Sequence, residues 1–193
     1  MNRFKRPLIY LGLVVIIALT IFYNTGCGGG SSSNSETKAT ASGKGLSEFT
    51  TTTLSGEKVD QSIFEDYDIT MVNFWATYCG PCIEEMPDLG EIYRERKADG
   101  FNVVGIVTDA QDESLQLIDD KVSEANSIID TTKADYEHLV LSEDIVTDIL
   151  SPYEVNSIPT TFFVDSQGKV IGDPYVGSRS KDVWNDVIKN VVK

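Results

Sequence analysis

The sequence predicts one α/β domain with a mixed central β-sheet and helices on both of its faces. Two short runs rich in β-branched and aromatic residues, 70–75 and 102–107, are typical of buried strands. The stretch between them, 80–98, repeats its apolar residues at helical spacing. Strands therefore alternate with helices at first, whereas a hairpin and a helix close the chain, and this order indicates a mixed sheet.

The first half of the domain is predicted to begin with a β-hairpin. Its strands are expected at 49–54 and 57–60, because the Ser-Gly dipeptide between them is a turn signal. The buried strand at 70–75 comes next and leads directly into the helix at 80–98. That helix is expected to end at Gly100, since glycine commonly terminates helices.

The second half is predicted to hold a polar helix, further strands and an amphipathic C-terminal helix. These elements are, in chain order, a polar helix at 112–127, a strand at 136–141, a short helix at 143–149, a hairpin of 160–164 with 169–171, and a helix capped by Ser180. The polar helix carries Leu115, Ile118 and Val122 on one stripe. The last helix has one apolar face, formed by Val183, Trp184, Val187, Ile188 and Val191.

Residues 1–27 have the pattern of a secretory leader. Three basic residues precede an apolar run at 8–23, which is shorter than the ~20 residues that span a bilayer comfortably. Small residues precede Cys27, and this arrangement looks like a bacterial lipoprotein signal in which that cysteine is lipidated. An uncleaved membrane anchor is the alternative. The expected order is a leader or anchor, a flexible Gly/Ser-rich tether at 28–45 and a folded domain at 46–193, outside the cytoplasm.

The charge balance excludes some classes of partner. The chain has 16 basic and 30 acidic residues and a formal net charge of −14. The leader holds three of the basic residues and none of the acidic ones, so the rest of the chain is more acidic still. Such a surface repels nucleic acid and anionic lipid headgroups. We therefore expect a domain that binds no nucleic acid and meets the membrane through its N-terminal anchor. A monomer is expected.

The motif Cys-Gly-Pro-Cys at 79–82 lies where the strand meets the helix. Two cysteines three residues apart can close a reversible disulfide, and free N–H groups at a helix start stabilise a thiolate. This pattern favours a thiol–disulfide exchange centre with Cys79 as the nucleophile and Cys82 as the shielded, resolving thiol. A zinc site is the main competitor, but zinc needs four ligands, and the chain adds only Cys27 and His138. A purely structural disulfide is the other alternative.

Glu85 and Pro159 complete the candidate site. Glu85 lies one turn after Cys82 on the same helical face, whereas Glu84 points away. A carboxyl group near two thiols and apolar neighbours should have a raised pKa, so Glu85 is a candidate proton acceptor. Pro159 stands directly before the apolar run at 160–164 and therefore marks the start of a strand.

Together these segments resemble a thioredoxin-fold oxidoreductase. The resemblance is carried by the residues at 74–82, by Pro87 and by Ile-Pro-Thr at 158–160. The leader, the early hairpin, and Asn73 with Glu85 are similar to the TlpA/ResA-type membrane-tethered thioredoxins of bacteria. The resemblance covers essentially the whole folded domain, and it implies a thioredoxin fold with an N-terminal β-hairpin extension and a helical insertion.

The resemblance also implies roles for individual residues. It implies that Pro159 is cis and lines the groove where a substrate strand pairs, beside Cys79 and Cys82. It maps the catalytic glutamate of the family onto Glu85. Cytosolic thioredoxins carry an aspartate at the position of Asn73, and the loss of that buried base makes Glu85 more important.

The implied function is reduction of protein disulfides outside the cytoplasm. Electrons would come from a membrane thiol donor of the CcdA/DsbD type. They would pass to oxidised envelope proteins, of which apocytochrome c and methionine sulfoxide reductases are typical clients. A disulfide oxidase or isomerase on the same fold is the alternative.

A copper-binding chaperone or scaffold module is the alternative from another functional class. Copper-binding relatives have three residues between their cysteines, whereas this chain has two. His138 is therefore expected to be a surface residue of a strand, and neither a metal nor a cofactor is predicted. A peroxidase is disfavoured as well, because the Pro/Thr-rich loop that carries a peroxidatic cysteine is missing.

Overall fold

A five-stranded β-sheet organises residues 45–192, the part of the chain that the computed structural model describes. Its strands are, in chain order, β3 (Ile69–Trp75), β4 (Phe101–Val107), β5 (Glu137–Val140), β6 (Thr160–Asp165) and β7 (Tyr175–Val176). The spatial order is β5-β4-β3-β6-β7. β3, β4 and β5 are parallel, β6 is antiparallel to β3, and β7 is antiparallel to β6. The predicted mixed sheet is confirmed.

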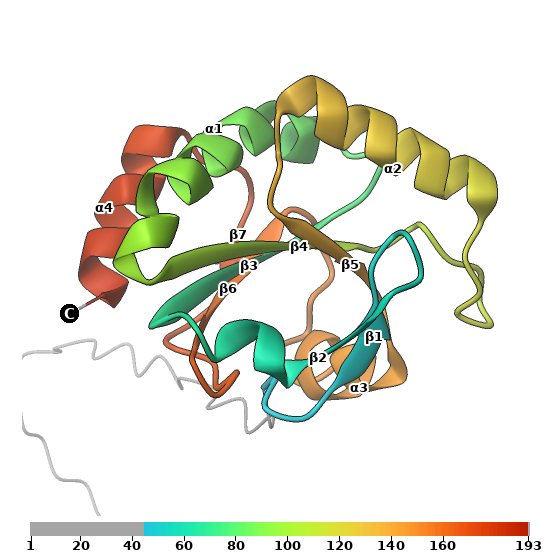
Figure 1. Ribbon diagram of the computed structural model, residues 1–193, viewed down its shortest axis with the longest axis horizontal. Coiled ribbons are helices and arrows are strands. Elements are labelled where there is room, and N and C mark those ends of the chain that lie inside the picture. Colours follow the sequence, from blue (N-terminus) through green and yellow to red (C-terminus); the bar gives the residue numbers. More distant parts are fainter. Residues whose placement is uncertain (1–44, 193) are drawn as a thin grey trace, which may run out of the picture. The chain divides into compact units, whose positions relative to one another are not determined.

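Helices cover both faces of this sheet (Figure 1). One face carries α1 (Gly80–Arg96), α2 (Asp119–Thr132) and α4 (Lys181–Val191). The other face carries α3 (Glu143–Ile145), which continues as a π-helical turn at Val146–Leu150. Two short 3₁₀ turns lie at Gln61–Phe64 and Lys97–Asp99, and the second ends at Gly100 in the left-handed conformation, as predicted.

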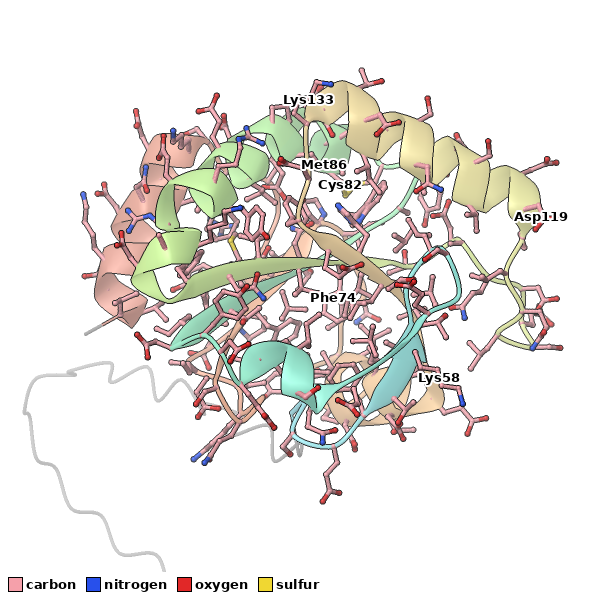
Figure 2. All side chains as sticks on the ribbon, viewed as in Figure 1. Lys58, Phe74, Cys82, Met86, Asp119 and Lys133 are labelled. Carbon is pink, nitrogen blue, oxygen red and sulfur yellow. A yellow bond between two sulfur atoms is a disulfide. The ribbon has the colours of Figure 1, made fainter. Side chains whose placement is uncertain are left out.

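The sheet separates two apolar cores, because successive side chains of a strand point to opposite faces. Trp75 of β3 packs with Cys82 and Met86 in the core under α1, α2 and α4. Phe74, its neighbour, packs in the core on the side of α3. Figure 2 shows this division, with Cys82 and Met86 above the sheet and Phe74 below it.

The N-terminal hairpin is confirmed as a separate two-stranded ribbon of β1 (Thr50–Thr52) and β2 (Lys58–Asp60). Its residue Thr51 donates a side-chain hydrogen bond of 2.7 Å to the carbonyl oxygen of Val140 in β5. The hairpin therefore lies against the edge strand β5, where it covers hydrogen-bonding groups that an open edge would expose.

The predicted helix at 112–127 is wrong in its position. α2 begins only at Asp119, because the residues before it form a loop. Asp112 accepts hydrogen bonds from the backbone N–H groups of Ser114 and Gln116, at 2.8 and 3.0 Å. Such side-chain bonds compete with a helical backbone, and Leu115 adopts the left-handed conformation at φ 58°.

The C-terminal hairpin also differs from the prediction. The turn after β6 is present, with the N–H of Asp165 donating to the carbonyl of Lys169 at 3.0 Å. The expected strand at 169–171 is reduced to one isolated bridge between Val164 and Val170. The ladder next to β6 is instead made by β7, which the sequence did not predict because it is only two residues long.

The leader at 1–27 lies outside the described residues, as does the tether at 28–45 except for Gly45. Within residues 45–192, none of the helices has the length and apolar character needed to cross a bilayer.

Candidate active site

The two cysteines lie at the start of α1, directly after the central strand β3. The N–H of Cys79 donates to the carbonyl of Ala76 at 3.0 Å, so the chain turns tightly between strand and helix. Cys79 is the N-cap of α1, and its sulfur accepts a hydrogen bond of 3.3 Å from the N–H of Cys82. The two sulfurs are joined in a disulfide. The N-terminal N–H groups and the helix dipole both favour negative charge on sulfur at this place.

The two sulfurs differ in their access to solvent. Cys79 keeps 6% of its surface exposed, whereas Cys82 has none. Tyr78, the residue directly before Cys79 in the chain, is 73% exposed. A partner protein can therefore approach from the side of Tyr78 and Cys79, while Cys82 is screened.

Glu85 is buried one turn further along α1. Its Oε1 accepts a hydrogen bond from the Asn73 amide at 3.1 Å. Its Oε2 accepts from the backbone N–H of Arg179 at 3.0 Å and from the indole N–H of Trp184 at 3.3 Å. Only 3% of the residue is exposed, and this burial raises the pKa of Glu85 although all three hydrogen bonds favour the ionised form. A carboxyl group whose pKa is raised by burial holds a proton more readily than an exposed one, so Glu85 is a candidate proton acceptor.

The side chains around Glu85 are buried, and some of their hydrogen-bonding atoms have no partner. Asn73 also donates to the hydroxyl of Thr161 at 3.0 Å, which leaves its own Oδ1 without a partner. The hydroxyl of Tyr136 is likewise buried without a partner. Burial raises the pKa of Tyr136, and the charge of Glu85 adds to that effect. The phenol is therefore neutral, whereas the charge of the partly exposed Arg179 favours the ionised form of Glu85.

Pro159 lies at the same end of the sheet as the disulfide. The Ile158–Pro159 peptide bond is cis. Thr160 pairs with Phe74 near the C-terminal end of β3. Pro159 therefore lies at the end of the sheet from which the chain leaves β3 toward Cys79. Ile158 and Tyr78 line a common surface pocket of about 240 Å³, together with Phe74, Thr108, Leu150, Val155, Asn156 and Ser157. This partly apolar pocket adjoins the exposed side of the cysteine loop.

His138 is not at the surface, and that expectation is corrected. It is 4% exposed, its Nδ1 accepts a hydrogen bond from the indole N–H of Trp75 at 3.2 Å, and its Nε2 donates to the carbonyl of Ala134 at 3.0 Å. Burial lowers its pKa to about 4, so the ring is neutral. Gly105 leaves space for it, since a Cβ there would collide with the imidazole.

Among residues 45–192, no three His, Cys, Asp or Glu side chains are grouped as metal ligands.

The structure brings Cys79, Cys82 and Glu85 together on one helix and places Pro159 at the same end of the sheet. Cys27 lies outside the described residues. Sequence reasoning missed Arg179, and it assigned Trp184 to packing alone. Both contact Glu85 across more than 90 positions of sequence, and no local pattern indicates such a contact.

The chain is similar in sequence to proteins named as thiol-disulfide oxidoreductases and as a thioredoxin-like protein. A family model described as the AhpC/TSA family matches residues 42–172. The chain is 28% identical over 149 residues to thiol-disulfide oxidoreductase ResA from Bacillus thuringiensis subsp. konkukian, covering 77% of this chain and 78% of that protein. It is 32% identical over 139 residues to thioredoxin-like protein YneN from Bacillus subtilis, covering 72% and 74%.

Solved structures agree with these relatives. The thioredoxin domain of a thiol-disulfide oxidoreductase from Bacteroides vulgatus superposes with a TM-score of 0.57 at 28% identity, covering 77% of this chain and 96% of that one. A thiol:disulfide interchange protein from a Bacteroides species gives a TM-score of 0.59 at 27% identity, covering 78% and 90%. The chain therefore belongs to the AhpC/TSA family, as a TlpA/ResA-like thiol–disulfide oxidoreductase with a thioredoxin fold.

Proposed function

We propose that this oxidoreductase reduces disulfides of envelope proteins outside the cytoplasm, through a dithiol of Cys79 and Cys82. The observation that carries the proposal is the buried carboxyl group of Glu85, one helical turn after the screened cysteine. The shielded Cys82 thiol must lose its proton to a base before it can attack a mixed disulfide. Glu85, whose pKa is raised, can serve as that base.

In the first step, the Cys79 thiolate attacks one sulfur of a client disulfide. The client disulfide breaks, a mixed disulfide forms between Cys79 and the client, and the displaced client sulfur takes a proton from solvent. The position of Cys79 as N-cap of α1 supports its role as the attacking thiolate, because the helix terminus stabilises negative charge there.

In the second step, Cys82 resolves the mixed disulfide. Glu85 accepts the proton of the Cys82 thiol, and the resulting thiolate attacks the sulfur of Cys79. The bond between Cys79 and the client breaks, and the departing client sulfur takes a proton, which Glu85 can return. The client leaves as a dithiol that has gained two electrons, and the enzyme is left as the Cys79–Cys82 disulfide. A dithiol donor must then reduce that disulfide and become oxidised itself.

The cellular setting of these steps follows from the leader sequence and is part of the proposal. A lipidated Cys27, or an uncleaved anchor at 1–27, would tie the domain to the outer face of a membrane through the tether at 28–45. A membrane thiol donor of the CcdA/DsbD type would supply electrons there. Apocytochrome c or methionine sulfoxide reductases would be the clients, and Pro159 with the pocket beside it would receive the client chain.

The direction of electron flow can be tested by trapping the redox state of the protein in cells. Acid quenching followed by alkylation with a mass tag separates the dithiol from the disulfide. We expect mainly the dithiol in normal cells and mainly the disulfide after removal of the membrane donor. A protein that is mainly a disulfide while the donor is present would contradict the reductase proposal and favour an oxidase.

The attachment can be tested by the intact mass of the membrane-extracted protein. Lipidation requires a mature chain that begins at Cys27 and carries acyl mass, and Cys27→Ala should block this maturation. A mass that retains Met1 would instead favour the uncleaved anchor.

A further inference from the structure

The loop that carries Cys79 is held by a polar network outside the site described above. The backbone N–H of Thr77 donates to Oδ1 of Asp109 at 3.0 Å, and its hydroxyl donates to Oδ2 of the same carboxylate at 2.7 Å. Asp109 follows directly after β4 and Thr108, which donates from its N–H and its hydroxyl to the carbonyl of Trp75 at 2.9 and 3.1 Å. The loop is therefore fixed two residues before Cys79.

Helix α2 extends this network through two side chains on its first turns. Lys121 donates to the hydroxyl of Thr77 at 2.9 Å and to Oε2 of Glu124 at 2.8 Å. It also forms an ion pair of 3.6 Å with Asp109. Glu124 Oε2 lies 3.1 Å from the Thr77 hydroxyl. One ammonium group and two carboxylates thus meet around a single hydroxyl group beside the cysteine loop.

The contact between Lys121 and Glu124 favours the charged forms of both side chains. The hydrogen bond with Lys121 lowers the pKa of Glu124, and the same contact raises the pKa of Lys121. The side chain of Asp109 is only 15% exposed, whereas those of Lys121 and Glu124 are 36% and 49% exposed. Two carboxylate side chains therefore lie near one ammonium group. Because Lys121 and Glu124 are partly exposed, they can be changed with little cost to folding.

We propose that Lys121 and Glu124 are positioning residues through which α2 sets the redox equilibrium of the Cys79–Cys82 couple. They contact Thr77 and place opposing charges two residues before Cys79. This inference rests on the proposed role of Cys79 as the attacking thiolate, and it assigns a function to a helix that lies outside the cysteine motif.

The sign of the effect follows from the charge that appears on reduction. When a dithiol donor reduces the enzyme, the S–S bond breaks, the donor becomes a disulfide, and two sulfurs are released as thiols. Where Cys79 remains a thiolate, its proton goes to solvent. Neighbouring cations stabilise that thiolate and favour the dithiol form, whereas neighbouring carboxylates favour the disulfide.

The test compares Lys121→Met with Glu124→Gln, measured as the equilibrium constant with glutathione at pH 7. Lys121→Met leaves two carboxylates unbalanced and should shift the equilibrium about threefold toward the disulfide. Glu124→Gln removes one carboxylate and should shift it about threefold toward the dithiol. The rate at which iodoacetamide alkylates reduced Cys79 should fall in the first variant and rise in the second, because it follows the thiolate population.

A matched control exists on α4, where Lys189 and Asp186 form an ion pair of 3.0 Å with the same spacing of three residues. Lys189→Met and Asp186→Asn change the net charge of the protein equally but lie away from the cysteine loop. They should leave both readouts unchanged. The other charged groups bonded at this end of the molecule, Glu85 and Arg179, are the same in every variant.

Shifts of the same sign in Lys121→Met and Glu124→Gln would overturn the inference, because a merely structural network is weakened by either change. Shifts no larger than those of the α4 controls would overturn it as well. Peptide mapping of the alkylated protein shows whether the α2 inference or the proposed function has failed. Labelling of Cys82 before Cys79 would contradict the proposed role of Cys79, and it would overturn the inference about α2 as well.

Discussion

The two faces of the central sheet are built from the same strands but carry different chemistry. The buried residues of the core under α3 have side chains that do not titrate, such as Phe74, Leu139 and Phe162. The face under α1, α2 and α4 holds both cysteines and every other buried titratable side chain of residues 45–192, namely Glu85, Tyr136 and His138. Neighbouring residues of one strand, such as His138 and Leu139 of β5, therefore lie on opposite faces with different chemistry.

This difference shows how the fold separates stability from reactivity. Burial of Phe74 and Leu139 needs only close packing, which stabilises the protein at any pH. Burial of Glu85 and His138 opposes their charged forms, and at Glu85 this burial raises the pKa of the proposed base. Leu139 on the α3 face should therefore affect stability alone. On the other face, the cysteines and Glu85 should affect exchange, and His138 should make stability depend on pH.

The largest effect is expected from the cysteines themselves. Cys79→Ser removes the attacking sulfur and should abolish disulfide exchange while the domain remains folded. Cys82→Ser should leave the first step intact and trap clients as mixed disulfides on Cys79. Gel analysis without reductant, together with mass spectrometry of the trapped species, checks both. Client adducts formed by the Cys79→Ser protein would reverse the assignment.

On the opposite face, Leu139→Ala should act on stability alone. Truncating a fully buried leucine typically costs about 2–5 kcal/mol in unfolding free energy, and Leu139 has no exposed surface. Urea unfolding measures this loss. The exchange rate of the folded variant should stay within about twofold of the parent, since its side chain points away from the cysteines. A tenfold slower exchange by the folded variant would break the proposed separation of the two faces.

His138, the residue before Leu139, should make stability depend on pH. Its folded pKa of about 4 lies below the ordinary 6.5, so the unfolded chain binds more protons between these values. The stabilising contribution is complete above pH 6.5 and declines as the pH falls toward 4. Between pH 7 and pH 5 the loss amounts to about 2 kcal/mol.

Comparison of the parent protein with His138→Gln isolates this contribution. Glutamine can still accept the indole hydrogen bond from Trp75, but it does not titrate. Urea unfolding at the two pH values should show a smaller loss in the variant than in the parent. Equal losses in both proteins would show that another group governs the acid sensitivity.

A smaller effect is expected from Glu85→Gln, which removes the proposed base and keeps the shape of the side chain. Exchange should slow about tenfold or more, because general base catalysis typically contributes at least that factor. Glu84→Gln is the matched control, since Glu84 is the exposed neighbour on the same helix and should have little effect. Equal rates for the parent and Glu85→Gln across neutral pH would eliminate the base role.

Much of this arrangement could be predicted from local sequence patterns. The strand at 70–75, the helix that starts at Gly80 and the early hairpin depend on short-range signals, and all three are present. The helical spacing of Cys82 and Glu85 places them one turn apart on α1, and Glu85 is buried as its expected raised pKa requires. These features follow from residues close together in the chain.

The remainder depends on long-range contacts or on competition between local signals. The partners of Glu85 at Arg179 and Trp184 come from a distant segment that only the tertiary fold brings near. His138 was expected at the surface because a single histidine in a strand gives no sign of the space left by Gly105. α2 starts later than predicted because the side chain of Asp112 accepts hydrogen bonds from two backbone N–H groups and holds the preceding residues in a loop. The apolar spacing of Leu115, Ile118 and Val122 did not indicate this competition.

The reduction potential of the Cys79–Cys82 couple tests the central claim most directly, because it fixes the direction of electron flow. Gly80 and Pro81 between the cysteines add no charge or side-chain donor that would hold Cys79 as a thiolate. A less stabilised thiolate makes a weaker oxidant, so we predict a potential below about −220 mV, in the range of reducing thioredoxins near −270 mV. A value above about −180 mV, the level of disulfide isomerases, would contradict the reductase account.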